Sequence, residues 1–226
     1  YVIGIGAGLL CGALVGIING VFIVKLKMVP FIMTLAMTNV LTGIGQVITK
    51  AALQPVRTSG FQPSSVKLGP VSMIVIIALL FAALFHFLLK YTVYGRHLTA
   101  QGNNNEAARK LGIHTERNAL IAYTICGAMA GLGGILSAGQ VGAISSNFAS
   151  GNEFDIIPAA VLGGISLFGG KGSVLPGALI GIVLVNTITN GLTMMAANPY
   201  VYTIVRGVII FIAVMLDSIN YKGELR

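Results

Sequence analysis

The run YVIGIGAGLLCGALVGIINGVFIV, residues 1–24, carries no charged side chain and decides the fold class of this protein. A helix needs about 20 consecutive apolar residues to cross the hydrocarbon core of a bilayer, and this run is long enough. Glycine recurs within it at every fourth position, at Gly8, Gly12, Gly16 and Gly20. Residues four apart share one helix face, and a face of glycines lets a second helix approach until the backbones touch. We therefore predict a membrane-spanning helix that packs tightly against a neighbour.

Further apolar runs follow along the chain, so we predict an all-α, polytopic transmembrane helical bundle of six or seven spans. The composition agrees, because only 9% of the residues are charged, whereas soluble domains have roughly 25%. The run 156–168 is short and glycine-rich, and we expect it to form either a full crossing or a half-membrane segment. The seven expected spans are residues 1–24, 29–49, 71–89, 119–143, 156–168, 174–195 and 201–217.

The positions of Lys and Arg predict the orientation of the chain, because loops on the cytoplasmic side are enriched in these residues. If the spans alternate in direction, ten basic residues lie on one side, three lie on the other, and Arg206 lies inside the last span. The ten are Lys25, Lys27, Lys90, Arg96, Arg109, Lys110, Arg117, Lys171, Lys222 and Arg226, and the three are Lys50, Arg57 and Lys67. We expect the first side, which includes the C-terminus, to be cytoplasmic. Because the basic residues lie between apolar runs, the net charge of +8 does not indicate a nucleic-acid partner.

The sequence contains no pattern that is typical of a catalytic or metal centre. Cys11 and Cys126 lie in apolar runs without metal-ligand spacing, so we expect neither a metal site nor a disulfide framework. The stretch GGKGS at 169–173 fails the pattern of a phosphate-binding loop, because Lys171 is followed by Gly. We expect no catalytic residue and no cofactor in this chain, so any ATP hydrolysis takes place in a separate chain.

The longest polar segment, YGRHLTAQGNNNEAARKLGIHTER at 94–117, lies between two strong spans. Asn105 is suited to cap a helix that begins at Glu106, and Gly112 is suited to the left-handed conformation that ends one. We therefore predict a short helix at residues 106–111, outside the bilayer. So short a helix is marginal in water, and the transmembrane body or another protein must hold it. A solvated connector and a docking helix for a partner are both open interpretations.

Several short motifs follow one another along the chain. They are GxxNG at 16–20, PFIxTL at 30–35, GxNxEAARxxGI at 102–113, EFDIIPAAVLGG at 153–164, GGKGS at 169–173, NGL at 190–192 and RG at 206–207. Their order and spacing resemble the permeases of bacterial ABC importers of the ribose/galactose/xylose type, and the resemblance covers essentially the whole chain. The chain departs from that pattern at Pro158, where Ala is common, and at Arg206, where Lys is usual.

The resemblance implies a single transmembrane permease domain over residues 1–226, with a cytoplasmic coupling loop at 90–118. In such importers a coupling helix in this loop sits in a groove of the ATPase subunit and transmits its closure to the spans. Here the matching residues are Glu106, Ala107, Ala108, Arg109, Lys110, Leu111, Gly112 and Ile113. Members of the family usually have about ten spans. Since the chain begins directly in an apolar run, we expect the first few spans to be missing.

The resemblance also implies a set of partners and a location. The expected partners are a second permease subunit in a homo- or heterodimer, a cytoplasmic ATP-binding subunit that holds ATP and Mg²⁺, an extracytoplasmic solute-binding protein, and the lipid bilayer. The location is the bacterial inner membrane, and the expected solute is a monosaccharide, carried by alternating access. Branched-chain amino acids or nucleosides are alternative solutes within the same superfamily. Outside that superfamily, a passive channel or a secondary carrier is also compatible with a bundle of apolar spans.

Neutral polar residues are candidates for lining the solute pathway. Asn186 and Asn190 share a helix face with Thr193 one turn further on, and Thr34, Thr38 and Asn39 form a second group. Amides and hydroxyls both donate and accept hydrogen bonds, which suits a neutral sugar, although helix-to-helix bonds explain them equally well. All six acidic residues lie in loops or at span ends, so a coupling ion has no obvious charged site.

Arg206 lies inside the last expected span, near its outer end. We expect its long side chain to anchor the span by reaching toward the outer surface. The acidic residues Glu153 and Asp155 lie on the outer side, where they suit either a basic surface of a binding protein or a simple exposed loop.

Overall fold

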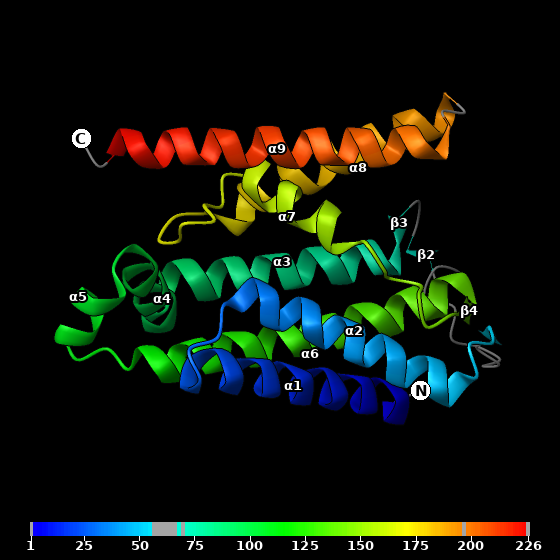
Figure 1. Ribbon diagram of the computed structural model, residues 1–226, viewed down its shortest axis with the longest axis horizontal. Helices are drawn as coiled ribbons and strands as arrows, with labels where there is room; N and C mark the ends of the chain where they lie inside the picture. Colours follow the sequence, from blue (N-terminus) through cyan, green and yellow to red (C-terminus); the bar gives the residue numbers. More distant parts are fainter. Residues whose placement is uncertain (1, 56–66, 69–70, 196–197, 225–226) are drawn as a thin grey trace. The chain divides into compact units, whose positions relative to one another are not determined.

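The computed structural model describes residues 2–55, 67–68, 71–195 and 198–224 (Figure 1). Most of the described chain is helical, which confirms the predicted all-α, polytopic bundle. Helices long and apolar enough to cross a membrane are found at Gly4–Lys25, Pro30–Thr49, Met73–Tyr91, Thr115–Val141, Val174–Met194 and Tyr200–Ile219. These agree with six of the seven predicted spans to within a few residues at each end.

The described helices are α1 (Val2–Lys25), α2 (Pro30–Thr49), α3 (Met73–Tyr91), α4 (Val93–Asn103), α5 (Asn105–Lys110), α6 (Thr115–Val141), α7 (Glu153–Leu162), α8 (Leu179–Met194) and α9 (Pro199–Glu224), with a π-helical segment η1 (Val174–Ala178) leading into α8. Short antiparallel strands pair β1 (Gln54–Pro55) with β4 (Ala143–Ile144), and β2 (Lys67–Leu68) with β3 (Val71–Ser72). The chain divides into two compact units. Unit 1 comprises Tyr1–Leu80 and His114–Ala149, and unit 2 comprises Phe81–Ile113 and Ser150–Arg226.

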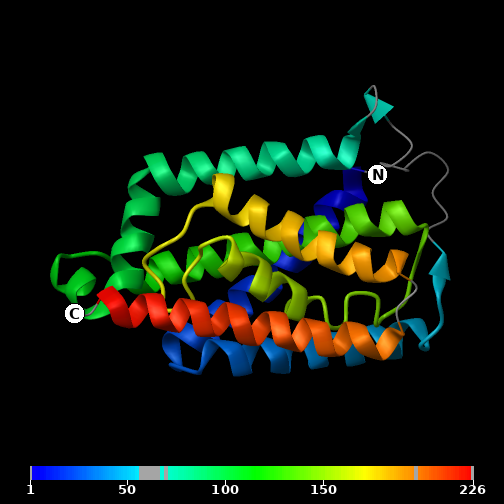
Figure 2. The same ribbon diagram turned by 90° about the horizontal axis from the view of Figure 1, so that it is seen from above.

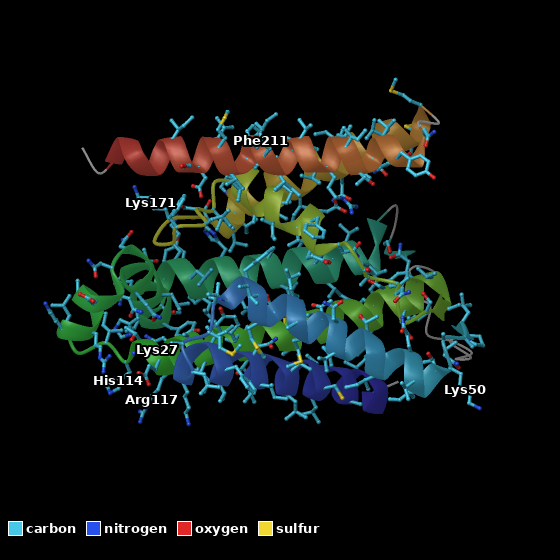
Figure 3. The ribbon with its side chains drawn as sticks, viewed as in Figure 1. Lys27, Lys50, His114, Arg117, Lys171 and Phe211 are labelled. Carbon is cyan, nitrogen blue, oxygen red and sulfur yellow. The ribbon has the colours of Figure 1, made fainter. Side chains whose placement is uncertain are left out.

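In unit 1, α1 and α6 lie antiparallel and in contact along their length (Figure 1). The glycine face of α1 meets α6: Gly12 lies against Gly127, and Gly16 lies against the backbone of Tyr123. Basic residues gather at one end of this unit, where Figure 3 shows Lys27 and Arg117, while Lys50 lies at the other end of α2.

In unit 2, the short helix α7 packs against both α8 and α9 (Figure 2). Its Pro158 is fully buried, and its Ala159 is 3% exposed. Val185 of α8 and Ala213 of α9 are also buried. Small side chains allow this close packing, since Gly181 of α8 lies against the carbonyl oxygen of Ala159. The core of unit 2 therefore lies around α7.

The predicted full span at 156–168 is wrong as a continuous helix. Helix α7 ends at Leu162, and ten residues make a helix of only about 15 Å, half the thickness of a bilayer core. Beyond it, Gly164 (φ +82°) and Gly169 (φ +91°) adopt left-handed backbone conformations that interrupt a helix. Residues 163–173, called the return segment below, continue from α7 to η1 without a helix. Helix α7 alone therefore covers only about half of a bilayer core.

Candidate functional site

A sharp corner joins α3 to α4 within unit 2. The hydroxyl of Thr92 donates a hydrogen bond to the Leu88 carbonyl oxygen (2.5 Å) and accepts one from the Gly95 amide (3.3 Å). One side chain thus completes the end of α3 and caps the start of α4. A Cβ at Gly95 would clash with the backbone of Leu89, so the corner requires glycine. Burial raises the pKa of Tyr94, in the first turn of α4, above its ordinary value of 10.0.

Helix α5 follows α4 and has one buried residue and an exposed outer surface. Its first turn is capped by Asn104, whose side-chain oxygen accepts a hydrogen bond from the Ala107 amide (2.9 Å). The predicted cap, Asn105, is wrong by one residue, since Asn105 is already the first residue of the helix. Gly112 has φ +81° and lies just beyond the helix end, as predicted. Ala108 is only 2% exposed, whereas Leu111 is 79% exposed.

The other residues of the predicted coupling group are arranged around this helix. Glu106, Ala107, Arg109, Lys110 and Gly112 are exposed, and Ile113 is half-buried. The Ile113 amide donates to the Ala108 carbonyl oxygen (3.1 Å), which closes the helix end. Helix α5 therefore presents a mixed charged and apolar surface, held to α4 on its buried side.

The return segment contacts the end of α4 and α9 and leads into η1, which in turn contacts α3. Gly102 of α4 lies against the backbone of Gly170, so closely that a Cβ on Gly102 would clash. Asp217 of α9 accepts a hydrogen bond from the Leu167 amide (2.8 Å). His86 of α3 accepts one from the Leu175 amide through Nδ1 (3.3 Å). The return segment, which follows α7 directly, therefore also contacts α4, the helix that precedes α5.

A cavity of about 350 Å³ lies along α7 and α8, with polar groups on both walls. Its polar lining residues are Asn152, Asp155, Asn186 and Thr189, and the remaining described lining is apolar. Asn186 donates through its amide nitrogen to the Ile182 carbonyl oxygen (2.9 Å), which leaves its own oxygen as an acceptor. We call this cavity the polar chamber.

Asp155, one of the residues that line the polar chamber, forms an ion pair. Arg206 of α9 donates to Asp155 of α7 at 2.5 Å and to the Gly151 carbonyl oxygen at 3.3 Å. Both side chains are about one third exposed. Arg206 therefore does more than the predicted anchoring of its span, because its guanidinium joins α9 to the start of α7. Asp155, in turn, is bonded to a residue of its own unit, Arg206.

The two predicted groups of pathway residues belong to different units. In α2, Thr34 and Thr38 donate to the Pro30 and Thr34 carbonyl oxygens (both 3.0 Å), and Asn39 donates to Leu35 (3.2 Å). In α8, Asn186 lines the polar chamber, Asn190 is exposed, and Thr193 donates to the Thr189 carbonyl oxygen (3.0 Å). Hydrogen bonds to the backbone of their own helix satisfy these hydroxyl and amide donors in an apolar setting. Each side-chain oxygen can still accept a hydrogen bond.

Within the described residues, no three His, Cys, Asp or Glu side chains gather closely enough to hold a metal ion. The described site consists of helix contacts and hydrogen-bonding groups.

The family described as "Branched-chain amino acid transport system / permease component" matches residues 1–214. The chain belongs to this permease family. The galactose/methyl galactoside import permease protein MglC of Escherichia coli is 36% identical over 221 residues, which are 94% of this chain and 66% of MglC. The ribose import permease protein RbsC of the same organism is 33% identical over 96% of this chain and 68% of RbsC. No solved structure matches the permease.

A third relative, the fructose import permease protein FrcC of Rhizobium meliloti, is 31% identical over 93% of this chain and 61% of FrcC. The permease thus spans about two thirds of the length of these relatives. These matches confirm the resemblance to the permeases of sugar importers. They also confirm a multi-pass membrane protein.

Several residues of the permease site escaped prediction. Thr92, Asn104 and Asp217 act through side-chain hydrogen bonds to the backbone, and Asn152 and Thr189 line the polar chamber. Thr189 lies three residues after Asn186, so helical spacing was a usable signal for it. For Asp217, whose partner lies 50 residues away, the sequence contained no such signal.

Proposed function

We propose that this permease is the membrane-spanning subunit of an ATP-driven ABC importer, and that its solute is a small polyhydroxylated molecule of the monosaccharide class. The observation that carries the proposal is the polar chamber, taken together with relatives named as galactose, ribose and fructose import permeases. Alternating access, driven by a separate ATPase, is the proposed mechanism.

The chemistry of the polar chamber supports a neutral, hydroxyl-rich solute. Amide and hydroxyl groups at Asn152, Asn186 and Thr189 both donate and accept, as the hydroxyls of a sugar do. Apolar side chains such as Ile156 and Ile182 fill the rest, and none of the described lining residues is aromatic. Without an aromatic surface for stacking, the chamber suits weak, transient binding, which lets a transported solute leave.

The exposed surface of α5 supports its role as the coupling helix. Its buried Ala108 holds the helix to the permease, while Arg109 and Leu111 offer a charged and an apolar contact to a partner. In this proposal the partner is the ATP-binding subunit, which holds ATP and Mg²⁺. Movement of α5 is transmitted through α4 and the Gly102–Gly170 contact to the return segment, and from there to α7 and the chamber.

Charge supports an orientation in the bacterial inner membrane with α5 and the C-terminus on the cytoplasmic side. Ten basic residues fall on that side and three on the other. A second permease copy or a close homologue, and an extracytoplasmic binding protein on the opposite face, complete the proposed assembly.

The test is reconstitution of the full-length permease with the ATPase and binding protein encoded beside it. We expect uptake of radiolabelled galactose, ribose or fructose into vesicles to require internal ATP and to persist when ion gradients are collapsed. Arg109→Ala is expected to lower transport and the ATPase stimulation together, whereas Lys25→Ala, an exposed cation on α1, changes neither.

Two results would contradict the proposal. Uptake that collapses with an ion gradient while ATP is present identifies a secondary carrier. Equal uptake with and without ATP, unaffected by Arg109→Ala, identifies a passive channel.

A branched-chain amino acid is the second candidate solute, because the family description names it. Asp155 of the polar chamber could pair with the ammonium group of an amino acid, and Arg206, which is bonded to Asp155, lies next to it. Competition between labelled leucine and unlabelled galactose in the same vesicles separates the two solutes. If leucine alone is taken up, the sugar proposal fails while ATP-driven import stands.

A further inference from the structure

We propose that a groove at the corner of α3 and α4 is a binding site for the headgroup of an anionic phospholipid. The groove has a volume of about 890 Å³ and lies wholly within unit 2, between α3, α4 and the return segment with η1. This site is separate from the polar chamber and takes no part in the proposed solute pathway. We call it the basic groove.

The charges that line the basic groove are all positive. Lys90 at the end of α3, Arg96 in α4 and Lys171 of the return segment line it, and none of its described lining residues is acidic. Figure 3 shows Lys171 on the return segment. Lys171 also lines a second cavity beside Asp217, so the cations that matter most here are Lys90 and Arg96.

These two cations suit a phosphate. Lys90 lies 5.5 Å from the ring centre of Tyr91 and is exposed, and Arg96 is also exposed. The guanidinium of arginine matches two phosphate oxygens at once, and lysine adds a compact charge. His86 adds a neutral donor: because its Nδ1 accepts from Leu175, the proton of the neutral ring is on Nε2.

The position of the basic groove favours a lipid over a soluble anion. It lies where the apolar span α3 ends, at Tyr91 and close to Tyr94, and tyrosine is typical of the membrane–water interface. Apolar side chains also line the groove, among them Leu89, Leu98 and Ile165. A phospholipid places a charged phosphate next to apolar chains, and basic pockets between membrane helices bind such headgroups.

The lipid chains also have a surface on which to lie. Leu84 and Phe87, two turns and one turn before the end of α3, are 48% and 60% exposed. They form an apolar strip that leads away from the headgroup site into the hydrocarbon. A free phosphate or a nucleotide has no acyl chains that could cover this strip. The ligand that we propose is therefore a phospholipid.

The test is native mass spectrometry of the complete transporter after exchange into equal parts of phosphatidylglycerol and phosphatidylcholine. We expect the wild type to retain phosphatidylglycerol in preference to phosphatidylcholine. In Lys90→Gln/Arg96→Gln the affinity for phosphatidylglycerol should fall roughly 30-fold, given the known contribution of each basic residue near a membrane surface. The matched control Lys25→Gln/Lys27→Gln removes the same charge from the end of α1 and should leave this affinity nearly unchanged.

A charge-preserving variant guards against a folding defect. Lys90→Arg/Arg96→Lys keeps both cations and should retain phosphatidylglycerol, which a structural role for these side chains would not predict. The proposal is overturned if the Gln variant retains the lipid as well as the wild type, or if phosphatidylcholine binds equally. It is also overturned if millimolar glycerol phosphate displaces the lipid completely, because the site then recognises a small phosphate, or if the groove stays closed to lipid because another subunit fills it.

Discussion

Arg206 is a charged residue inside an apolar span, and its partner accounts for its presence there. A lone cation in a membrane helix is costly, but Asp155 neutralises it and the Gly151 carbonyl oxygen accepts a further hydrogen bond. The pair also holds the first turn of α7 against α9, where both side chains line a small cavity next to the polar chamber. Because the two residues lie 51 positions apart, neither hydropathy nor helical spacing indicates that they meet.

Asp155→Ala should therefore lower the stability of the permease. We expect a loss of about 1 kcal/mol, since charge-assisted hydrogen bonds contribute more when buried and this pair is partly exposed. The measurement is the free energy of unfolding of the purified chain, from titration of mixed micelles with dodecyl sulfate. Glu153→Ala removes a carboxylate from the same helix turn and should cost less. An equal loss in both variants would mean that the ion pair adds nothing beyond negative charge near the start of α7.

The glycine face of α1 leads to a second prediction at the scale of single residues, on the packing of α1 against α6. Gly12→Ala places a methyl group against the Gly127 carbonyl, a backbone atom that cannot move aside without shifting α6. Overpacking of this kind costs roughly 1–3 kcal/mol, and we expect a loss of that size in the same unfolding measurement.

Gly6→Ala is the matched control for this substitution. It lies on the same helix with no other atom within reach of the added Cβ. It should leave stability unchanged or raise it slightly, because alanine favours the helical state. Unchanged stability in Gly12→Ala would show that α1 and α6 do not pack through this face in the membrane.

At the scale of elements, the structure shows which of two neighbouring asparagines caps α5, a choice that the sequence leaves almost even. In the run Asn103-Asn104-Asn105 each side chain is suited to cap a helix, and composition favours none of them. In the structure Asn104 has an extended backbone (φ −157°, ψ 107°) and accepts from Ala107, whereas Asn105 is helical.

Asn104→Ala should therefore destabilise α5 by about 1 kcal/mol, the usual contribution of such a cap. If α5 is the coupling helix, its folded population falls and transport slows by a factor of roughly 5. The measurement is ATP-driven uptake by the reconstituted importer, with Asn104→Asp expected to restore it. Asn105→Ala is expected to have little effect, and a larger effect there than in Asn104→Ala would contradict the observed cap.

The elements differ in how well the sequence predicts them, for a physical reason. A full span needs about 20 apolar residues in any order, so mean hydropathy finds α1, α2, α3, α6, α8 and α9 to within a few residues. The apolar run 156–168 is as long as a short span, but α7 ends within it at Leu162. The left-handed backbone at Gly164 and Gly169 prevents the helix from continuing. Hydropathy contains no information on that conformation.

At the scale of the whole molecule, the family and the position of α5 were predictable, while most of the chamber was not. The motif at 102–113 indicated where α5 lies, because it depends on local sequence alone. Asn186 was predicted by its helical spacing, but its neighbours Asn152 and Asp155 approach it only through the packing of α7 on α8. Contacts between residues distant in the chain need the fold itself.

The path of the return segment predicts on which side of the membrane each end of unit 2 lies. Gly170 contacts Gly102 next to α5, and Leu167 bonds to Asp217 near the end of α9, whereas Asp155 meets Arg206 near its start. Helix α7 and the return segment together therefore complete a crossing, although neither is long enough alone.

Single cysteines test this in a chain whose Cys11 and Cys126 are replaced by alanine. With a membrane-impermeant maleimide, Ser150→Cys should be labelled in intact cells, and Lys171→Cys and Ile219→Cys only after permeabilisation. Labelling of Lys171→Cys in intact cells would mean that the chain returns to the outer face after α7, and it would remove the contact through which α5 is proposed to move the chamber.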